Sequence, residues 1–371
     1  MKIKSVEINL YRKKHEKPIL NGKYIYDATH LVTCKVNTDE GISGIGWTYD
    51  RSKVITGNSL RRMGEIVIGE DPFNVERIWS YLYLPKVFGR KGFAVRAMSC
   101  IDIACWDIMG KASNRPLYQL LGGYREQVPV YVAAGYYGDG KTIKELKDEM
   151  KGKVEHYEGV KAVKIKIGRL SVKEDEKRIA AVREGVGDEV DILVDANNAY
   201  SRIDGLRMGK VLDDYNIFWF EEPYAPDDLT GAAELSSRIV TPIAAGENEY
   251  TCYGFRDMID QKAADIINAN PQILGGITQW KKIADYAYAN HIPIAPHGDQ
   301  EINVHLVCAV SNGLIVEYYD TTTNALRDKM FTENVVLNKN GTLSPSKKPG
   351  LGVEMDFEAL EPYKVESYTI A

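Results

Sequence analysis

Three acidic residues stand where consecutive short apolar segments of the chain end. They are Asp195, Glu221 and Glu247. Three negative charges held close together require a cation or several protons. Mg²⁺ is a hard cation that prefers oxygen ligands and leaves positions for water and substrate oxygens. A single acid at such a place is more often a helix N-cap, but three in succession predict a Mg²⁺ site.

The tripeptide Lys164-Ile165-Lys166 carries a second chemical signal. Side chains alternate along a strand, so both lysines point to one face and Ile165 to the other. Neighbouring ammonium groups lower each other's pKa. One lysine can then act as a neutral base while the other offsets substrate charge. The alternative is a solvated basic strand end without a chemical role.

His297 follows the apolar segment 292–296. A lone histidine after a strand is more often structural than catalytic, but opposite the lysines it becomes a second acid or base candidate. Asn197 follows the same segment as Asp195, and Asn270 and Glu317 follow two further segments, so seven consecutive segments each deliver an ionisable or amide group.

The segments that carry these residues share one rhythm, a short apolar strand followed by a helix-like stretch. They cover residues 128–134, 162–167, 190–194, 217–220, 241–245, 264–268, 292–296 and 314–316. The spacing of roughly 20 to 35 residues suits one strand, one helix and two loops. A (β/α)₈-type barrel is predicted, in which the C-terminal strand ends converge on one mouth.

The chain before the barrel has a different pattern. Apolar and polar residues alternate over 3–10 and 30–36, which predicts an antiparallel meander. We expect the segment 15–27 between these strands, with Tyr24 and Tyr26, to be a mobile loop that touches a ligand.

Helical spacing follows over residues 72–123. The last segment departs from the barrel rhythm and is rich in turn residues. We therefore expect an N-terminal α+β capping domain over 1–125, a catalytic barrel over 126–320, and a C-terminal segment over 321–371 that packs back on the capping domain.

Composition excludes several classes of partner. The 371 residues are 44% hydrophobic and 27% charged, with a formal net charge of -5. Without a basic tract, neither nucleic acid nor a membrane surface is expected as a partner. The five cysteines are odd in number and scattered, which indicates reduced thiols. No signal-peptide pattern and no run of about 18 apolar residues occurs, so a cytoplasmic location is expected.

The order and spacing of these motifs resemble the mandelate racemase group of the enolase superfamily across essentially the whole chain. The matching pieces are Ala97 to Met109 with Asp102 and Trp106-Asp107, Lys164 with Lys166, Asp195-Ala196-Asn197, Phe220-Glu221-Glu222-Pro223, Gly246-Glu247, Gly275-Gly276-Ile277-Thr278, Pro296-His297 and Pro349-Gly350-Leu351-Gly352. The resemblance implies an α+β capping domain over a (β/α)₇β barrel of the TIM type, and a homo-oligomer from dimer to octamer.

The resemblance also implies roles for the residues. Asp195, Glu221 and Glu247 would be Mg²⁺ ligands. Lys166 would be the base on one face of the substrate and His297 would act on the other. Lys164 would lie beside the substrate carboxylate, and Glu317 would donate a hydrogen bond to that carboxylate as it becomes an enediolate. A Lys or His base working with Mg²⁺ is established for this superfamily.

One residue departs from the family pattern. Asn270 stands where an aspartate usually orients and charges the histidine. A neutral amide can orient the ring but cannot stabilise an imidazolium as a carboxylate does. This weakens a symmetric two-base racemase, unless Asp299 or Glu301 supplies the missing charge. A dehydratase asks the histidine only to deliver a proton to the departing 3-hydroxyl.

The favoured reaction is therefore dehydration of an aldonate or aldarate to a 2-keto-3-deoxy acid. A sugar-lactone cycloisomerase is the runner-up, and a hydroxy-acid racemase or epimerase is a further alternative. A Schiff-base aldolase that uses Lys164 or Lys166 without metal, and a binding module without turnover, are more distant readings.

Substrate-binding residues are expected among the tyrosines. Phenols with an arginine suit a hydroxyl-rich acid. The candidates are Tyr24, Tyr26, Tyr49, Arg51, Tyr136 and Tyr137, together with Asn197 and Asn270.

Overall fold

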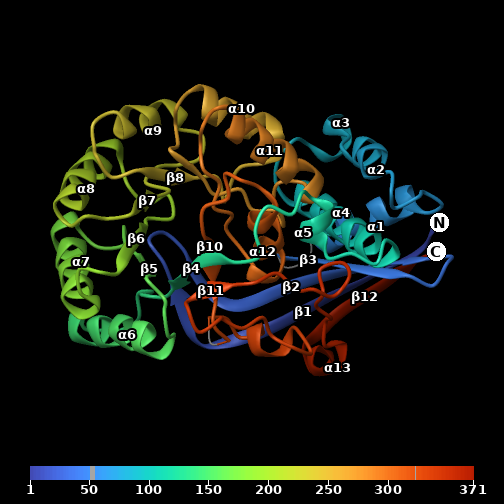
Figure 1. Ribbon diagram of the computed structural model, residues 1–371, viewed down its shortest axis with the longest axis horizontal. Helices are drawn as coiled ribbons and strands as arrows, with labels where there is room; N and C mark the ends of the chain where they lie inside the picture. The colour runs from blue at the N-terminus through green and yellow to red at the C-terminus, as the bar shows by residue number, and fades with distance from the viewer. Residues whose placement is uncertain (51–54, 322) are drawn as a thin grey trace.

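The computed structural model describes residues 1–50, 55–321 and 323–371. Arg51, expected at the mouth, lies outside these residues. Figure 1 shows a ring of helices around the barrel strands, with long antiparallel strands and a helical group beside it. Among the described residues, no helix combines the length and the apolar character that a membrane crossing requires.

The N-terminal sheet is antiparallel, with the strand order β12-β1-β2-β3. Its strands are β1 (Ile3–Leu20), β2 (Ile25–Thr38), β3 (Ser43–Tyr49) and β12 (Lys364–Ile370). Val6, Ile8 and Leu10 of β1 are buried at every second position, as a strand with one covered face requires. The predicted meander is present, and a strand from the other end of the chain extends it.

The expectation of a mobile loop over residues 15–27 was wrong. Both strands continue through it, and Leu20 pairs with Ile25 after a register shift beyond Lys14. The tip is closed by the side chain of Asn21, which accepts hydrogen bonds from the backbone N–H groups of Lys23 and Tyr24. Local turn chemistry at Asn21 and continued strand pairing therefore override the loop-like composition.

The tip of this hairpin rests on the barrel. The backbone N–H of Tyr137 donates to the carbonyl of Leu20 at 3.0 Å. At Gly22 the chain lies so close to the barrel that an added Cβ would stand 2.2 Å from the carbonyl oxygen of Ala196. Only glycine permits this approach, which brings residues of the N-terminal sheet to the edge of the barrel mouth.

A helical group packs against the N-terminal sheet. It consists of α1 (Ile55–Val67), α2 (Val75–Leu82), α3 (Pro85–Phe88), α4 (Phe93–Ala112) and α5 (Leu117–Leu120). Helix α4 carries the predicted apolar spacing, and its Met98, Ile101 and Cys105 are buried in one cluster with residues of β1 and β2. This cluster is the core of the N-terminal part.

The barrel has the predicted (β/α)₇β order. Its strands are β4 (Val128–Ala133), β5 (Ala162–Lys166), β6 (Asp191–Asp195), β7 (Trp219–Glu221), β8 (Ile243–Ala245), β9 (Ile266–Ile267) and β10 (Val316–Tyr318). Its helices are α6 (Ile143–His156), α7 (Val172–Val186), α8 (Arg202–Asp214), α9 (Leu229–Ser236), α10 (Thr251–Asp260), α11 (Ile277–Ala289) and α12 (Gln300–Ala309). The strands pair in parallel in the order β10-β4-β5-β6-β7-β8-β9.

The seventh barrel position is not a strand, although residues 292–296 were expected to form one. Single parallel bridges join Ile294 to Ile267 on one side and to Gly313 on the other. Pro293 and Pro296 flank the bridge and have no N–H to donate, so a longer ladder cannot form. A buried interior cluster still takes one residue from each barrel position, which are Tyr131, Ala162, Leu193, Trp219, Ala244, Ile266, Ala295 and Ile315.

The C-terminal segment contacts both parts of the molecule. It contains η1 (Arg327–Lys329), β11 (Thr342–Leu343), α13 (Phe357–Leu360) and η2 (Glu361–Tyr363) before β12. Strand β11 pairs with β4 of the barrel, and β12 pairs with β1, so the two chain ends lie close together (Figure 1). We propose a division into 1–125, 126–320 and 321–371 on these contacts.

Candidate active site

Strand register brings the predicted acids and lysines to one level of the barrel. Lys166 at the end of β5 pairs with Asp195 at the end of β6, and Asp195 pairs with Glu221 at the end of β7. Glu247 follows β8 after Gly246. Residues far apart in sequence thus meet because neighbouring parallel strands end together.

The three acids form one cluster. Asp195, Glu221 and Glu247 each offer an oxygen within 4.8 Å of the other two. Asp195 and Glu221 are fully buried. Desolvation, then the neighbouring Asp195, raises the pKa of Glu221 to about 8. Such a cluster is costly unless positive charge balances it.

The cluster fits a hard divalent cation. Its donors are all carboxylate oxygens, which Mg²⁺ prefers. Oε2 of Glu247 is buried and has no hydrogen-bond donor, so it is free to coordinate. Asn197 fixes the first acid, because its backbone N–H and its Nδ2 donate to Asp195 at 2.8 and 3.1 Å. The indole N–H of Trp219 donates to Glu221 at 3.1 Å.

Lys164 lies beneath this cluster, fully buried. Its Nζ is 2.7 Å from Oε1 of Glu317 and 3.0 Å from Oε2 of Glu221. Burial by itself would lower the pKa of Lys164, but Glu221 and Glu317 outweigh it and hold the pKa well above its ordinary value. Lys164 is therefore a fixed positive charge in the floor of the site.

Lys166 contacts Asp195 directly, and the ring of Tyr136 lies 5.4 Å from its Nζ. The expected lowering of its pKa by Lys164 is present, but it does not set the net direction. Burial and Lys164 do lower the pKa, but Asp195 raises it by more, and the net direction is upward. The expectation counted one charged neighbour and omitted the carboxylate on the adjacent strand.

His297 lies at the other end of the cluster. Its Nε2 is 3.1 Å from Oε2 of Glu247, without hydrogen-bond alignment, and 3.2 Å from the hydroxyl of Tyr319. Its Nδ1 is 2.9 Å from Nδ2 of Asn270. Glu317 lies 3.8 Å from Nε2, so one carboxylate approaches both His297 and Lys164.

Neither Asp299 nor Glu301 replaces the missing aspartate beside His297. Both carboxylates bind the guanidinium of Arg327, at 2.9 and 2.7 Å. Asp299 also accepts from the indole N–H of Trp47 at 2.6 Å. Through these contacts the start of α12 is connected to Trp47 of the N-terminal sheet and to Arg327 of the C-terminal segment. Asn270 is thus the side chain that contacts Nδ1 of His297.

The tyrosines predicted to bind substrate contact three separate parts of the protein. The hydroxyl of Tyr137 donates to Asp175 at 2.6 Å, at the start of α7. Tyr49 reaches Asp299 at 3.3 Å. Tyr24 and Tyr26 stack on each other in the hairpin, with centroids 6.3 Å apart. None of these contacts joins the acid cluster.

Three tyrosines do contact the proposed catalytic groups. The ring of Tyr131 lies 5.1 Å from Nζ of Lys164. Tyr136 faces Lys166 and Tyr319 contacts His297. Sequence reasoning offered Tyr136 only as one candidate among several, and it missed Tyr131 and Tyr319. The signal for Tyr319 was its position two residues after Glu317, just past the end of β10, because alternation along an extended chain directs both side chains to one face.

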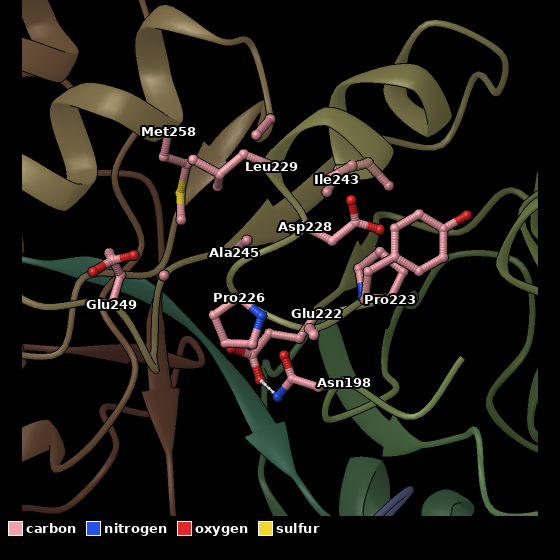
Figure 2. Close-up of a pocket in the computed structure, with 15 residues that line it drawn as sticks. Asn198, Glu222, Pro223, Pro226, Asp228, Leu229, Ile243, Ala245, Glu249 and Met258 are labelled. Carbon is pink, nitrogen blue, oxygen red and sulfur yellow. Dashed lines mark hydrogen bonds between the residues drawn. The ribbon is translucent and has the colours of Figure 1, made fainter. Parts of the chain in front are cut away.

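Glu222 and Glu249 are neighbours in sequence of the proposed ligands, but their carboxylates contact other side chains. Glu222 accepts from Nδ2 of Asn198 at 2.9 Å and from Asn248, and Glu249 pairs with Lys91 at 2.8 Å. Figure 2 shows Glu222 and Asn198 directed toward each other at one edge of a small cavity. Its volume is about 30 Å³ and its walls are largely apolar, so it is too small for a sugar acid.

Comparison with known proteins places these features in context. Residues 6–122 match the family model of the mandelate racemase / muconate lactonizing enzyme N-terminal domain, and residues 145–360 match that of the enolase C-terminal domain-like family. An arabinonate dehydratase of Saccharolobus solfataricus is 35% identical over 91% of both chains. A 3,6-anhydro-alpha-L-galactonate cycloisomerase of Streptomyces coelicolor is 31% identical over 90% of this chain and 93% of that protein.

A solved structure shows the same fold over nearly the whole chain. L-talarate/galactarate dehydratase of Salmonella typhimurium, liganded with Mg and L-lyxarohydroxamate, has a TM-score of 0.90 and 27% identity. The match covers 99% of this chain and 94% of that one.

Proposed function

The chain belongs to the mandelate racemase / muconate lactonizing enzyme family of the enolase superfamily, and from this premise we propose that it is a Mg²⁺-dependent sugar-acid dehydratase. The substrate is an aldonate or aldarate, and the product is a 2-keto-3-deoxy acid. The observation that carries the proposal is the acid cluster with Lys166 at the Asp195 end and His297 at the Glu247 end.

Asp195, Glu221 and Glu247 would hold the Mg²⁺ ion. Bound there, the ion stabilises the negative charge that develops on the substrate carboxylate and lowers the pKa of the neighbouring ammonium groups. The protein supports the three ligands through Asn197 and Trp219, which fix the orientation of two of the carboxylates.

Lys166, as the neutral amine, takes the proton from the carbon next to the carboxylate. Its burial limits water access, and the ring of Tyr136 covers one side of its Nζ. Lys164 remains charged and faces the substrate carboxylate. Glu317 is held by Lys164, whose charge outweighs burial and lowers the pKa of Glu317 to about 2. To donate to the same carboxylate as it becomes an enediolate, Glu317 must take up a proton when the substrate binds.

His297 assists departure of the 3-hydroxyl by donating from Nε2. This ring nitrogen lies between Glu247 and Tyr319. Tyr319 contacts His297 at one end of the cluster and the ring of Tyr136 lies against Lys166 at the other, and we propose both as substrate contacts beside Asn197. The earlier candidate Tyr137 ranks below them because its hydroxyl donates to Asp175, and Tyr24 and Tyr26 remain proposed contacts from the hairpin.

A library of aldonic and aldaric acids tests the proposal. With Mg²⁺, at least one acid should give a 2-keto acid that reacts with semicarbazide. EDTA should abolish the reaction, and added Mg²⁺ should restore it. A metal-independent reaction that borohydride traps on a lysine would favour an aldolase instead.

Cycloisomerisation of a sugar lactone or an anhydro sugar acid is the second candidate. Two relatives named as cycloisomerases are 31% and 30% identical to this chain. Three relatives named as dehydratases are 35%, 30% and 28% identical to it. The first half-reaction is the same in both classes. Isomeric product without loss of water, from a lactone or anhydro substrate, would select this candidate.

We also propose that the protein is a homo-oligomer. Large apolar side chains are exposed on and next to α2 and α3, namely Phe73, Tyr81, Leu84 and Val87. Because these side chains lie close together along the chain, we infer that they share one apolar surface, and exposed apolar surfaces are typical of protein interfaces. Light scattering coupled to size exclusion should give a mass that is a multiple of 41.6 kDa.

A further inference from the structure

Helix α7 places a buried arginine behind the proposed base. Arg178 is 4% exposed, and its Nη2 donates to the carbonyl of Lys166 at 3.2 Å and to the carbonyl of Gly135 at 3.1 Å. The two carbonyls stand at the ends of neighbouring strands, because Lys166 is the last residue of β5 and Gly135 lies just past β4. One guanidinium therefore ties the two strand ends together from the helix layer.

The guanidinium of Arg178 is itself held on two sides. Its Cζ lies 4.0 Å from the centroid of the Tyr137 ring, and its Nε is 3.4 Å from Oδ1 of Asp175. Asp175 in turn accepts from the hydroxyl of Tyr137 at 2.6 Å and from the backbone N–H of Gly168 at 2.8 Å. Stacking on an aromatic ring and the planar fork of donors pre-organise an arginine, so Arg178 has little freedom to move.

The chain beside Lys166 bends sharply at Gly135. The φ of Gly135 is +63°, and an added Cβ would lie 2.6 Å from Cγ2 of Ile165, so the bend requires glycine. The carbonyl of Gly135 accepts from the backbone N–H of Lys166 at 3.3 Å as well as from Arg178. Tyr136 follows the bend, and its ring centroid lies 5.4 Å from Nζ of Lys166. The placement of this ring and that of Lys166 thus depend on the same carbonyl.

From these contacts we propose that Arg178 is a positioning residue that holds Lys166 against Tyr136 and so sets its distance from the α-carbon of the substrate. Arg178 acts through the backbone of both residues. The inference rests on the proposed function, because it takes Lys166 as the base, and it adds a residue of α7 to the groups on which the reaction depends.

The rate should be sensitive to this arrangement. A base must lie within hydrogen-bond reach of the proton that it removes, and a misplacement of about 1 Å can lower a rate about 10²-fold. Substrate affinity depends on other groups, which are the acid cluster with its ion and the charge of Lys164. Loss of Arg178 should therefore lower kcat far more than it changes KM.

Arg183 on the same helix offers a matched control. It is half-buried and also donates to backbone carbonyls, those of Gly187 and Val190 at 2.9 and 2.6 Å and those of Tyr215 and Asn216 at 3.3 and 3.2 Å. These carbonyls come before β6 and β7, at the end of the barrel opposite the acids. A variant of this arginine loses hydrogen bonds of the same kind and leaves the mouth intact.

Amide hydrogen exchange, followed by mass spectrometry, tests the support of the strand ends without turnover. In Arg178→Met, peptides that cover residues 134–137 and 164–168 should exchange at least about 10-fold faster than in the wild type. In Arg183→Met the faster exchange should fall on residues 187–191 and 215–219 instead. Arg178→Lys keeps a donor and replaces the methionine variant if that protein does not fold. Unchanged exchange of residues 164–168 in the folded variant overturns the inference.

Kinetics separate positioning from stability. With a reactive sugar acid and Mg²⁺, Arg178→Met should lower kcat by about 10²-fold and change KM by less than about 3-fold. Exchange of the α-proton in D₂O should fall by the same factor, because both reactions need Lys166 in place. Arg178→Lys should recover at least about 10-fold of the loss, since its ammonium can still donate to the carbonyls. Arg183→Met should keep kcat within about 3-fold of the wild type.

Three results would overturn the inference. They are an equal loss of kcat in both methionine variants, a raised KM with unchanged kcat in Arg178→Met, and an undiminished rate of α-proton exchange in that variant. Failure of every sugar acid to dehydrate in the wild type contradicts the proposed function instead, and the amide exchange then still decides whether Arg178 fixes the strand end that carries Lys166.

Discussion

Acid destabilisation of this protein should depend strongly on one buried histidine outside the active site. His305 in α12 is 1% exposed. Its Nδ1 accepts from the backbone N–H of Tyr118 at 3.3 Å, and its Nε2 donates to the carbonyl of Leu351 at 2.9 Å. Burial lowers its pKa from 6.5 to about 4. The ring therefore stays neutral in the folded protein while it gains a proton in the unfolded chain.

The sign and size of the effect follow from this lowered pKa. Between pH 6.5 and 4 the unfolded chain binds more protons than the folded protein, so the free energy of unfolding falls as the pH falls. Each tenfold change in proton affinity is worth about 1.4 kcal/mol. His305 alone should thus remove on the order of 3 kcal/mol across this window.

Urea unfolding of wild type and His305→Gln from pH 7.5 to 4.5 measures the effect. Glutamine keeps a donor for Leu351 but cannot take a proton. At pH 7.5 the variant should be less stable by about 1–2 kcal/mol, because the bond to Tyr118 is lost. The gap should close as the pH falls. Parallel profiles for the two proteins would refute the reasoning. His156→Gln, at an exposed histidine, is the control and should follow the wild type throughout.

Three further substitutions test the site and its support. Glu247→Gln should weaken Mg²⁺ binding by at least about 10-fold in calorimetry. The control is Glu249→Gln, which should leave the affinity unchanged because the Glu249 carboxylate pairs with Lys91 in the wild-type protein. Equal affinities in both variants would show that Glu247 is not a ligand. Lys166→Met should reduce keto-acid formation by at least about 10²- to 10⁴-fold in a coupled assay, and near-normal turnover would move the base elsewhere. Arg327→Met leaves two buried carboxylates without their partner and should lower the free energy of unfolding by about 3–5 kcal/mol at pH 7. The loss should be smaller at pH 5.5, because burial raises the pKa of Glu301 and this carboxyl can then take a proton. A loss below about 1 kcal/mol would show that the pair is solvated.

The barrel and its strand-end residues could be predicted because their signals are local. Alternation within Lys164-Ile165-Lys166 and the regular spacing of apolar segments depend on neighbours along the chain. The seventh barrel position shows the limit of this approach. Its apolar content indicates a strand, but Pro293 and Pro296 limit the pairing to single bridges at Ile294, one to each neighbouring barrel position.

Contacts between distant segments could not be predicted in this way. Trp47 and Asp299 are 252 residues apart and share a hydrogen bond. Without that contact, Asp299 is an equally good candidate for the partner of His297. The net direction of the pKa shift of Lys166 could not be predicted for the same reason, because this shift depends on Asp195 of the adjacent strand. In the hairpin, composition indicated a loop, whereas pairing of Leu20 with Ile25 extended the strands.

The most direct test of the central claim separates proton removal from loss of water. With a reactive sugar acid, Mg²⁺ and D₂O, His297→Asn should still exchange the α-proton while its keto-acid formation falls by about 10²- to 10³-fold. Lys166→Met should lose both exchange and product. Loss of exchange in His297→Asn together with its retention in Lys166→Met would contradict the account, because it would make the histidine the base.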